Sequence, residues 1–262
     1  MAHKLTLPPL VDTHAHLTFD PIWSHLEAVL DRATQTGVGR VLVPAFDLNS
    51  WTKIKSLLSV NGIYGAFGIH PWKASENLDV DELRHVMRLP DAVAIGEVGL
   101  DFKIETFSKQ QQMELLKVQL DVAVSMNKPV MLHCRGAFME LLELIKSYDG
   151  RLRGVIHAFS RGPDLAFEFV RLGLHVAFGG AITRPNAKRA RNAATMVPWE
   201  SIVLETDCPS IGLNDVAPAQ TEPMHVSEVA SELAKLRDTT HAYVAQITTR
   251  NAEMLFGLPE IE

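Results

Sequence analysis

The chain has 262 residues, of which 47% are hydrophobic and 21% are charged. This balance is typical of a folded globular protein and excludes a disordered or fibrous chain. The formal net charge of −6 excludes an overall positive field that would attract nucleic acid or an anionic membrane, so a polyanion would have to be bound by a local group of residues.

Short apolar runs rich in β-branched residues recur along the chain and predict eight strands. In chain order they cover residues 10–17, 40–46, 64–71, 92–99, 129–134, 154–159, 175–179 and 202–206. The segments between them are mostly long enough for a helix. In residues 22–37, for example, apolar residues from Ile22 to Ala33 share one face, and Gly37 can end the helix.

Eight alternations of strand and helix predict a parallel sheet, either a closed barrel or an open doubly wound sheet. Eight such units fill about 250 residues in the barrel fold. A Rossmann fold would require a GxGxxG turn after a strand, and the chain has none. We therefore predict an α/β fold, a (β/α)₈ TIM barrel that forms a single domain over residues 1–262.

Side chains that can bind metal follow five of the predicted strands at the same end. The C-terminal ends of the strands form the active-site rim of a parallel barrel. A histidine at one strand end is usually a hydrogen-bonded rim residue, but four imidazoles and two carboxylates together would be costly without a cation between them. The candidate metal ligands are His14, His16, Glu97, His133, His157 and Asp207.

Six ligands are too many for one tetrahedral ion and suit two divalent cations that share a carboxylate and a water. His14 and His16 are two residues apart, so they face the same side of their strand. Glu97 is the expected bridge, because the fourth strand lies opposite the first across the barrel. The mixed ligand set admits zinc, manganese, iron or magnesium and does not choose among them.

Six motifs, DTHAH, GIHPW, GEVGLDF, LHCR, HAFS and LETDCP, occur in this order along the chain. Together they resemble the TatD family of metal-dependent deoxyribonucleases, within the amidohydrolase-like metallohydrolases, and in particular its YjjV-type bacterial members. The resemblance continues to RNAEMLF near the end of the sequence. It implies the same six metal ligands and a hydrolase that cleaves phosphodiester bonds in DNA, with a 3′–5′ exonuclease on single-stranded or short DNA as the expected activity.

We expect Asp207 to be the catalytic proton acceptor. Glu205, two residues earlier on the same face, is expected to orient a ligand or to take part in proton transfer, and alternatively to be a buried carboxylate paired with a nearby base. Asp12 is expected to support the first two histidines or to cap a loop.

Binding of the substrate phosphate is predicted for His70 and Arg135, which follow the third and fifth strands; His70 could equally be an ordinary rim histidine. A dense basic stretch after the seventh strand is a second candidate for phosphate contacts, or simply a solvated helix face: Arg184, Lys188, Arg189 and Arg191. Trp72 and Phe102 follow rim motifs and are candidates for stacking on a base.

Two other classes of function remain open. The same two cations could act on a carbonyl carbon, in an amidohydrolase or esterase for a small cyclic amide or ester. A binding protein without enzyme activity is disfavoured by the complete ligand set.

Two cysteines outside any CxxC pair, and the absence of a signal-like or membrane-spanning apolar run, predict a cytoplasmic protein without membrane contact. We also expect a monomer with no stable protein partner.

Overall fold

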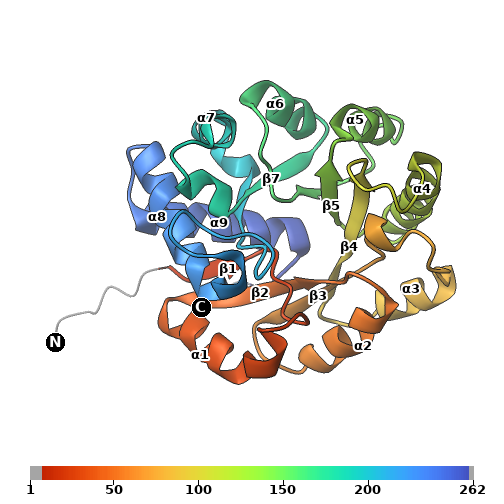
Figure 1. The fold of residues 1–262 in the computed structure, drawn as a ribbon, viewed down its shortest axis with the longest axis horizontal. Helices are drawn as coiled ribbons and strands as arrows, with labels where there is room; N and C mark the ends of the chain where they lie inside the picture. Colours follow the sequence, from red (N-terminus) through yellow and green to blue (C-terminus); the bar gives the residue numbers. More distant parts are fainter. Residues whose placement is uncertain (1–7, 260–262) are drawn as a thin grey trace.

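Eight parallel strands form a barrel at the centre of the structure (Figure 1). The computed structural model describes residues 8–259. Each strand pairs in parallel with the next, without reversal of order, which confirms the predicted (β/α)₈ TIM barrel and excludes the doubly wound alternative. The strands are β1 (Leu10–Asp12), β2 (Val38–Pro44), β3 (Ile63–Phe67), β4 (Ala92–Asp101), β5 (Val130–Arg135), β6 (Gly154–Ile156), β7 (Leu174–Phe178) and β8 (Ile202–Leu204).

The first and last strands meet along a seam formed by the residues that follow them. The backbone N–H of Thr13 donates to the carbonyl of Leu204 at 3.0 Å, and the N–H of Asp207 donates to the carbonyl of His14 at 2.8 Å. β1 and β8 are shorter than the sequence predicts, because the chain bends into the barrel mouth soon after Asp12 and again soon after Leu204. Asp207 lies at this bend with a left-handed φ of 52°.

Helices surround the barrel on its outer face (Figure 1). Among residues 8–259, no helix combines the length and apolar character that crossing a membrane requires. The α-helices are α1 (Leu26–Gln35), α2 (Leu48–Leu57), α3 (Val80–Val86), α4 (Lys109–Ser125), α5 (Phe138–Lys146), α6 (Pro163–Arg171), α7 (Lys188–Met196), α8 (Val226–Leu236) and α9 (His241–Phe256). Short 3₁₀ helices cover Trp23–His25, Pro71–Lys73, Gly180–Thr183, Trp199–Ser201, Pro218–Gln220 and Pro223–His225.

The predicted helix in residues 22–37 is present as a 3₁₀ turn followed by α1. Ile22, Val29 and Ala33 are buried against the barrel, as the apolar stripe predicts. Gly37 follows the helix with a φ of 86°, a conformation that a residue with a side chain rarely adopts, and the chain reverses there into β2.

The last helix, α9, closes one end of the barrel. Ala252, Leu255 and Phe256 of α9 belong to the same buried cluster as strand residues such as Leu42 and Met131. A second and larger core fills the space between the strands and the outer helices. The polar residues at the strand ends lie at the opposite, C-terminal end of the barrel.

Two buried glutamines of α4, Gln112 and Gln119, hold the backbone beside the barrel mouth. They lie about two helical turns apart and so face the same side of the helix. The side chain of Gln119 accepts from the N–H of Ile69 at 2.7 Å and donates to its carbonyl at 3.2 Å. Gln112 binds the N–H of Asp101 at 2.8 Å and its carbonyl at 3.0 Å in the same way. α4 therefore fixes the segment after β3 and the end of β4.

Replacement of Gln119 tests this clamp. Gln119→Met keeps the volume and helix propensity but leaves the buried N–H and C=O of Ile69 without partners, so the free energy of unfolding should fall by about 2–4 kcal/mol. Urea denaturation followed by circular dichroism measures the change. Gln110→Met, at an exposed position of the same helix, should change it by less than about 0.5 kcal/mol. Equal stability of the two variants would refute the clamp.

Candidate metal centre

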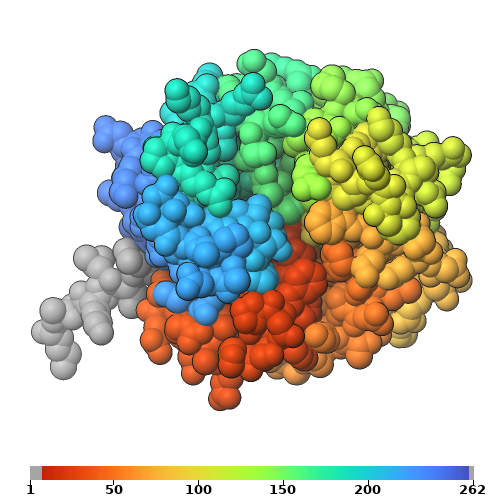
Figure 2. All heavy atoms as spheres, viewed as in Figure 1, coloured from red at the N-terminus to blue at the C-terminus, as the bar shows by residue number. Residues whose placement is uncertain are grey.

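A cavity of about 630 Å³ lies at the mouth of the barrel. Five of the six predicted ligands line it, and the sixth, His14, is fully buried in contact with them. The loop after β8 and the segment after β1 lie side by side at this mouth, in light blue and red in Figure 2. The structure therefore brings together all six side chains that the sequence singles out.

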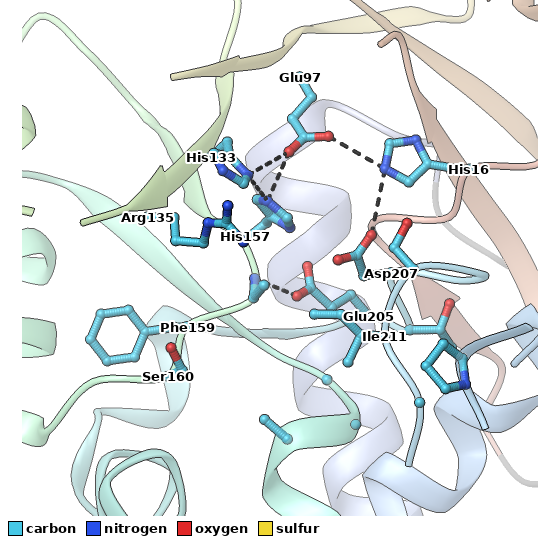
Figure 3. A pocket seen from close by; sticks show the side chains of 18 of the residues that line it. His16, Glu97, His133, Arg135, His157, Phe159, Ser160, Glu205, Asp207 and Ile211 are labelled. Carbon is cyan, nitrogen blue, oxygen red and sulfur yellow. Dashed lines mark hydrogen bonds and ion pairs between the residues drawn. The ribbon is translucent and has the colours of Figure 1, made fainter. Parts of the chain in front are cut away.

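Glu97 of β4 is the centre of the group (Figure 3). Its carboxylate is 2% exposed, and its two oxygens face different histidines. Oε2 lies 3.3 Å from Nε2 of His14 and 3.4 Å from Nε2 of His16. Oε1 lies 3.0 Å from Nδ1 of His133 and 2.9 Å from Nε2 of His157. One carboxylate thus divides the four imidazoles into two pairs.

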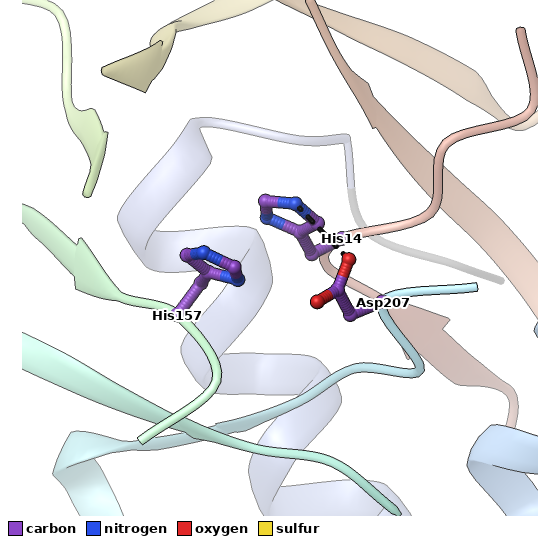
Figure 4. Close-up of side chains that lie close together, drawn as sticks. All are labelled: His14, His157 and Asp207. Atoms are coloured by element: carbon purple, nitrogen blue, oxygen red, sulfur yellow. Dashed lines mark ion pairs between the residues drawn. The ribbon is translucent and has the colours of Figure 1, made fainter. Parts of the chain in front are cut away.

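Asp207 completes the group from the end of β8 (Figure 4). Its Oδ1 lies 3.8 Å from Nε2 of His14 and 3.5 Å from Nε2 of His16. His157 lies beside them, and its ring stacks on that of His14 with centroids 4.1 Å apart. Ligand atoms of His14, His157 and Asp207 lie within 4.8 Å of one another. The left-handed backbone at Asp207 aims the carboxylate at the histidines.

Gly99 allows β4 and β5 to approach at the level of the centre. Its φ is 152°, and a Cβ there would lie 2.0 Å from the carbonyl oxygen of His133. A side chain at this position would push His133 away from Glu97. The second glycine of the GEVGLDF motif, Gly99, therefore has a packing role.

The pKa values of the histidines differ because each has a different balance of burial and charge. Burial lowers the pKa of His14 to about 4. Burial also disfavours charge on His16, but the carboxylates of Asp207 and Glu97 outweigh it and raise that pKa to about 10. Burial is likewise outweighed at His133, where Asp101 and Glu97 raise the pKa to about 9.

The arrangement fits divalent cations. Imidazole nitrogens and carboxylate oxygens converge on one small space. Nε2 of His14 and Nε2 of His16 lie 3.3 Å apart, and because only one of them can donate a proton to the other, at least one offers a lone pair. Oδ1 of Asp207 is buried and accepts no hydrogen bond among residues 8–259. A buried set of imidazole nitrogens and carboxylate oxygens of this kind could hold a metal ion.

His70, predicted to bind phosphate, lies against the centre itself. The backbone N–H of Trp72 donates to Nδ1 of His70 at 3.1 Å, so the neutral ring carries its proton on Nε2. Nε2 lies 3.3 Å from Oε1 of Glu97. Burial lowers the pKa of His70 to about 4, which keeps the ring neutral. His70 is therefore a hydrogen-bond donor that points at Glu97 from the cavity wall.

Arg135, the other predicted phosphate-binding residue, lines the cavity with a side chain that is 53% exposed. Its Nε donates to the carboxylate of Asp101 at 2.9 to 3.0 Å. Its guanidinium carbon lies 5.6 Å from the centre of the Trp72 ring. Among the described residues only Nε has a hydrogen-bond partner, which leaves the two Nη groups for a ligand.

Glu205 and Asp12 have different surroundings. Oε1 of Glu205 accepts from the backbone N–H of Ala158, next to His157, at 2.5 Å. Oε2 of Glu205 has no hydrogen-bond partner within residues 8–259, so the alternative of pairing with a nearby base finds no support there. Burial and the negative charge of Asp207 raise the pKa of Glu205. Asp12 accepts from the N–H groups of His14 and Thr206, at 3.2 and 3.0 Å, and so supports the seam.

The basic stretch after β7 separates into three kinds of residue. Arg191 is not free for phosphate, because it donates to Glu232 of α8 at 2.7 Å and to the carbonyl of Ile182. Arg184 lines the cavity and donates to the carbonyl of Gly212. Lys188 and Arg189 are exposed in the first turn of α7. Of the predicted cluster, these last two face solvent.

The two aromatic candidates for base stacking also differ. Trp72 is 42% exposed and lines the cavity. Phe102 packs against the hydrophobic core, with Nζ of Lys109 4.8 Å from its ring centre, and does not line the cavity. Phe19 and Phe46, which the sequence does not single out, extend the aromatic wall beside Trp72.

Asp101 is the main site residue that sequence reasoning missed. It is fully buried at the end of β4 and lies 3.3 Å from Nε2 of His133. A signal was present, because Asp101 stands four positions after Glu97 in the GEVGLDF motif, where strand residues face the same side. Its partners, Trp72 in the 3₁₀ helix after β3 and two residues of β5, could not be read from spacing along the chain.

The model of the family described as TatD related DNase matches residues 11–257. The relative "Uncharacterized metal-dependent hydrolase YjjV" of Escherichia coli K12 is 34% identical over 254 residues, which cover 95% of this chain and 98% of the relative. The crystal structure of the same E. coli protein, described as a TatD homologue, has a TM-score of 0.89 at 32% identity and covers 97% of this chain and 100% of its own.

A third similar protein is "3'-5' ssDNA/RNA exonuclease TatD" of Edwardsiella piscicida, 29% identical over 260 residues that cover 95% of this chain and 100% of that protein. The matches extend over the barrel and over all six predicted ligand positions. They confirm the predicted family. The chain belongs to the TatD family of metal-dependent hydrolases.

Proposed function

We propose that this protein is a two-cation phosphodiesterase that degrades DNA, as a 3′–5′ exonuclease acting on single-stranded or short strands. The observation that carries the proposal is the division of the Glu97 carboxylate, whose two oxygens face two separate pairs of histidines. A shared carboxylate between two ligand groups is the arrangement of two-metal hydrolases. The name of the Edwardsiella relative supports a nucleic acid as the substrate.

The ligand assignment follows the contacts. His14 and His16 would hold one cation with Oε2 of Glu97, and His133 and His157 the other with Oε1. Asp207 lies closest to the first pair. Bound zinc, manganese or magnesium would lower the pKa of a water and neutralise phosphate charge.

The remaining side chains provide proton transfer and substrate binding. Asp207 accepts the proton of the attacking water and returns it to the leaving oxygen, with Glu205 beside it as an orienting group. The free Nη groups of Arg135 and the Nε2–H of His70 bind the phosphate oxygens from the opposite wall. Trp72 offers an exposed ring on which a base can stack.

The cleavage assay tests the proposal directly. Protein loaded with Zn²⁺, Mn²⁺ or Mg²⁺ should shorten 5′-end-labelled single-stranded DNA stepwise from its 3′ end, as resolved on a denaturing gel. A duplex of the same sequence should be cut more slowly, because a paired strand does not fit a cavity of about 630 Å³. Failure to cut DNA with any of these metals, together with turnover of a panel of lactones and dipeptides, would replace the proposal with an amidohydrolase or esterase.

Asp207→Asn tests the proton acceptor. The amide keeps the shape and one ligand oxygen but cannot take a proton, so kcat should fall on the order of 10²–10⁴-fold while most of the metal stays bound. Kinetics on labelled DNA and metal analysis of the dialysed protein measure the two quantities. Asp164→Asn, on the exposed face of α6, is the matched control and should retain wild-type kcat. Normal turnover by the Asp207 variant would remove the residue from this role.

Metal loading should release protons. His16 and His133, with pKa values of about 10 and about 9, must lose their protons before these nitrogens can bind a cation. At neutral pH about two protons should therefore leave per chain, and affinity should fall as pH falls, by about tenfold per released proton per pH unit. Titration calorimetry in two buffers of different ionisation enthalpy counts the protons.

The control for this titration is His85→Asn, which removes an exposed histidine of α3 and should leave the proton count unchanged. Binding that is independent of pH between about 6 and 8 would contradict the ligand assignment of His16 and His133.

A further inference from the structure

Asp101 lies at the end of β4 with its carboxylate fully buried. Four donors converge on its two oxygens. Oδ1 accepts from the backbone N–H of Lys103 at 3.0 Å and from Nε of Arg135 at 3.0 Å. Oδ2 accepts from Nε1 of Trp72 at 2.7 Å and from Nε2 of His133 at 3.3 Å. A carboxylate can accept all four, whereas an amide oxygen can accept only two of them.

Three of these donors belong to different parts of the site. His133 is an assigned metal ligand, and its other nitrogen, Nδ1, faces Glu97 and Nε2 of His157 at 3.0 and 3.2 Å. Arg135 and Trp72 line the cavity. We propose that Asp101 is a positioning residue that fixes the metal-binding face of His133 and, with the same carboxylate, aims the Arg135 guanidinium and the Trp72 ring at the substrate.

Asp101 selects the tautomer of His133. A proton on Nε2 satisfies Oδ2 of Asp101 and leaves the lone pair on Nδ1, the nitrogen that faces Glu97. Without the carboxylate the ring is free to place its proton on Nδ1 or to rotate. A cation between His133 and His157 would then lose one ligand or part of its strength.

Asp101 also sets the direction in which the Arg135 and Trp72 side chains point. The Nε contact with Asp101 leaves both Nη groups of Arg135 free, and the Trp72 indole N–H holds the ring beneath the guanidinium carbon at 5.6 Å. The backbone of Asp101 is itself held by Gln112 of α4, through both its N–H and its carbonyl. The carboxylate is therefore anchored before any ligand binds.

The kinetic part of this inference rests on the proposed phosphodiesterase function, but the metal-binding part does not. Asp101→Ala removes all four acceptors and should weaken metal binding by about 10- to 100-fold, measured by titration calorimetry. At saturating metal, KM for labelled DNA should rise by about 10-fold or more, because Arg135 and Trp72 are no longer aimed.

Single-partner variants separate the contributions. Trp72→Phe and Arg135→Met each remove one donor but leave the contact between Asp101 and His133, so both should keep wild-type metal affinity while raising KM. Asp121→Asn, which alters an acceptor for the Tyr148 hydroxyl outside the lining of the cavity, is the matched control and should change neither quantity.

Tryptophan fluorescence gives a readout that a loss of folding would not mimic. The chain has four tryptophans, and only Trp72 contacts Asp101. Asp101→Ala should shift the emission spectrum in the wild-type background and should not shift it in a Trp72→Phe background. If Asp101→Ala does not fold, Asp101→Asn replaces it; its single amide oxygen must abandon one donor pair, so metal affinity falls or KM rises.

Wild-type metal affinity and wild-type KM in the Asp101 variants would overturn the positioning role. The proposed function fails separately, if the wild-type protein does not cleave DNA. In that case a lower metal affinity of Asp101→Ala would still support the role of Asp101 in holding His133.

Discussion

The buried carboxylate of Glu97 is the contact on which the mouth of this barrel depends. Its oxygens lie within 3.4 Å of nitrogens on His14, His16, His133 and His157. Burying one charge among so many polar groups is unfavourable unless cations or protons neutralise it. The strands carrying these groups must close into a barrel before the groups can meet, so the centre exists only in the completed fold.

The groups that close the barrel also support the centre. Asp12 accepts hydrogen bonds from backbone N–H groups of the segments that follow β1 and β8, and it thereby fixes both His14 and the approach to Asp207. On the other side, Gln112 of α4 holds Asp101, which in turn contacts His133. A proposed metal ligand on each side of Glu97 is thus connected to the scaffold by buried side-chain hydrogen bonds. Such supports would keep the geometry of these side chains from being set by a bound cation alone.

Spacing along the chain was sufficient to predict the strands and the convergence of six side chains, because the C-terminal ends of parallel strands share one rim. It failed where the decisive partner comes from another part of the chain. Arg191 belongs to a basic run, yet its partner Glu232 lies on α8. His70 sits on the rim as predicted, but its proton is directed by the backbone of Trp72. Gln112 and Gln119 carry no spacing signal, because their roles lie in contacts between elements. Asp101 has the right spacing from Glu97, but its contact with His133 cannot be read from that spacing.

The charge distribution has a consequence for any polyanionic substrate. The net charge is −6, Arg191 is paired with Glu232, and Arg135 shares its charge with the buried Asp101. Among the basic residues of the rim, Lys188 and Arg189 stand exposed at the start of α7. Under the proposed function, attraction for a phosphodiester would therefore come mainly from bound metal and from Arg135 at the cavity rather than from the outer surface. Under the proposed function this favours a strand end that enters the cavity over a long duplex that would be tracked along the surface.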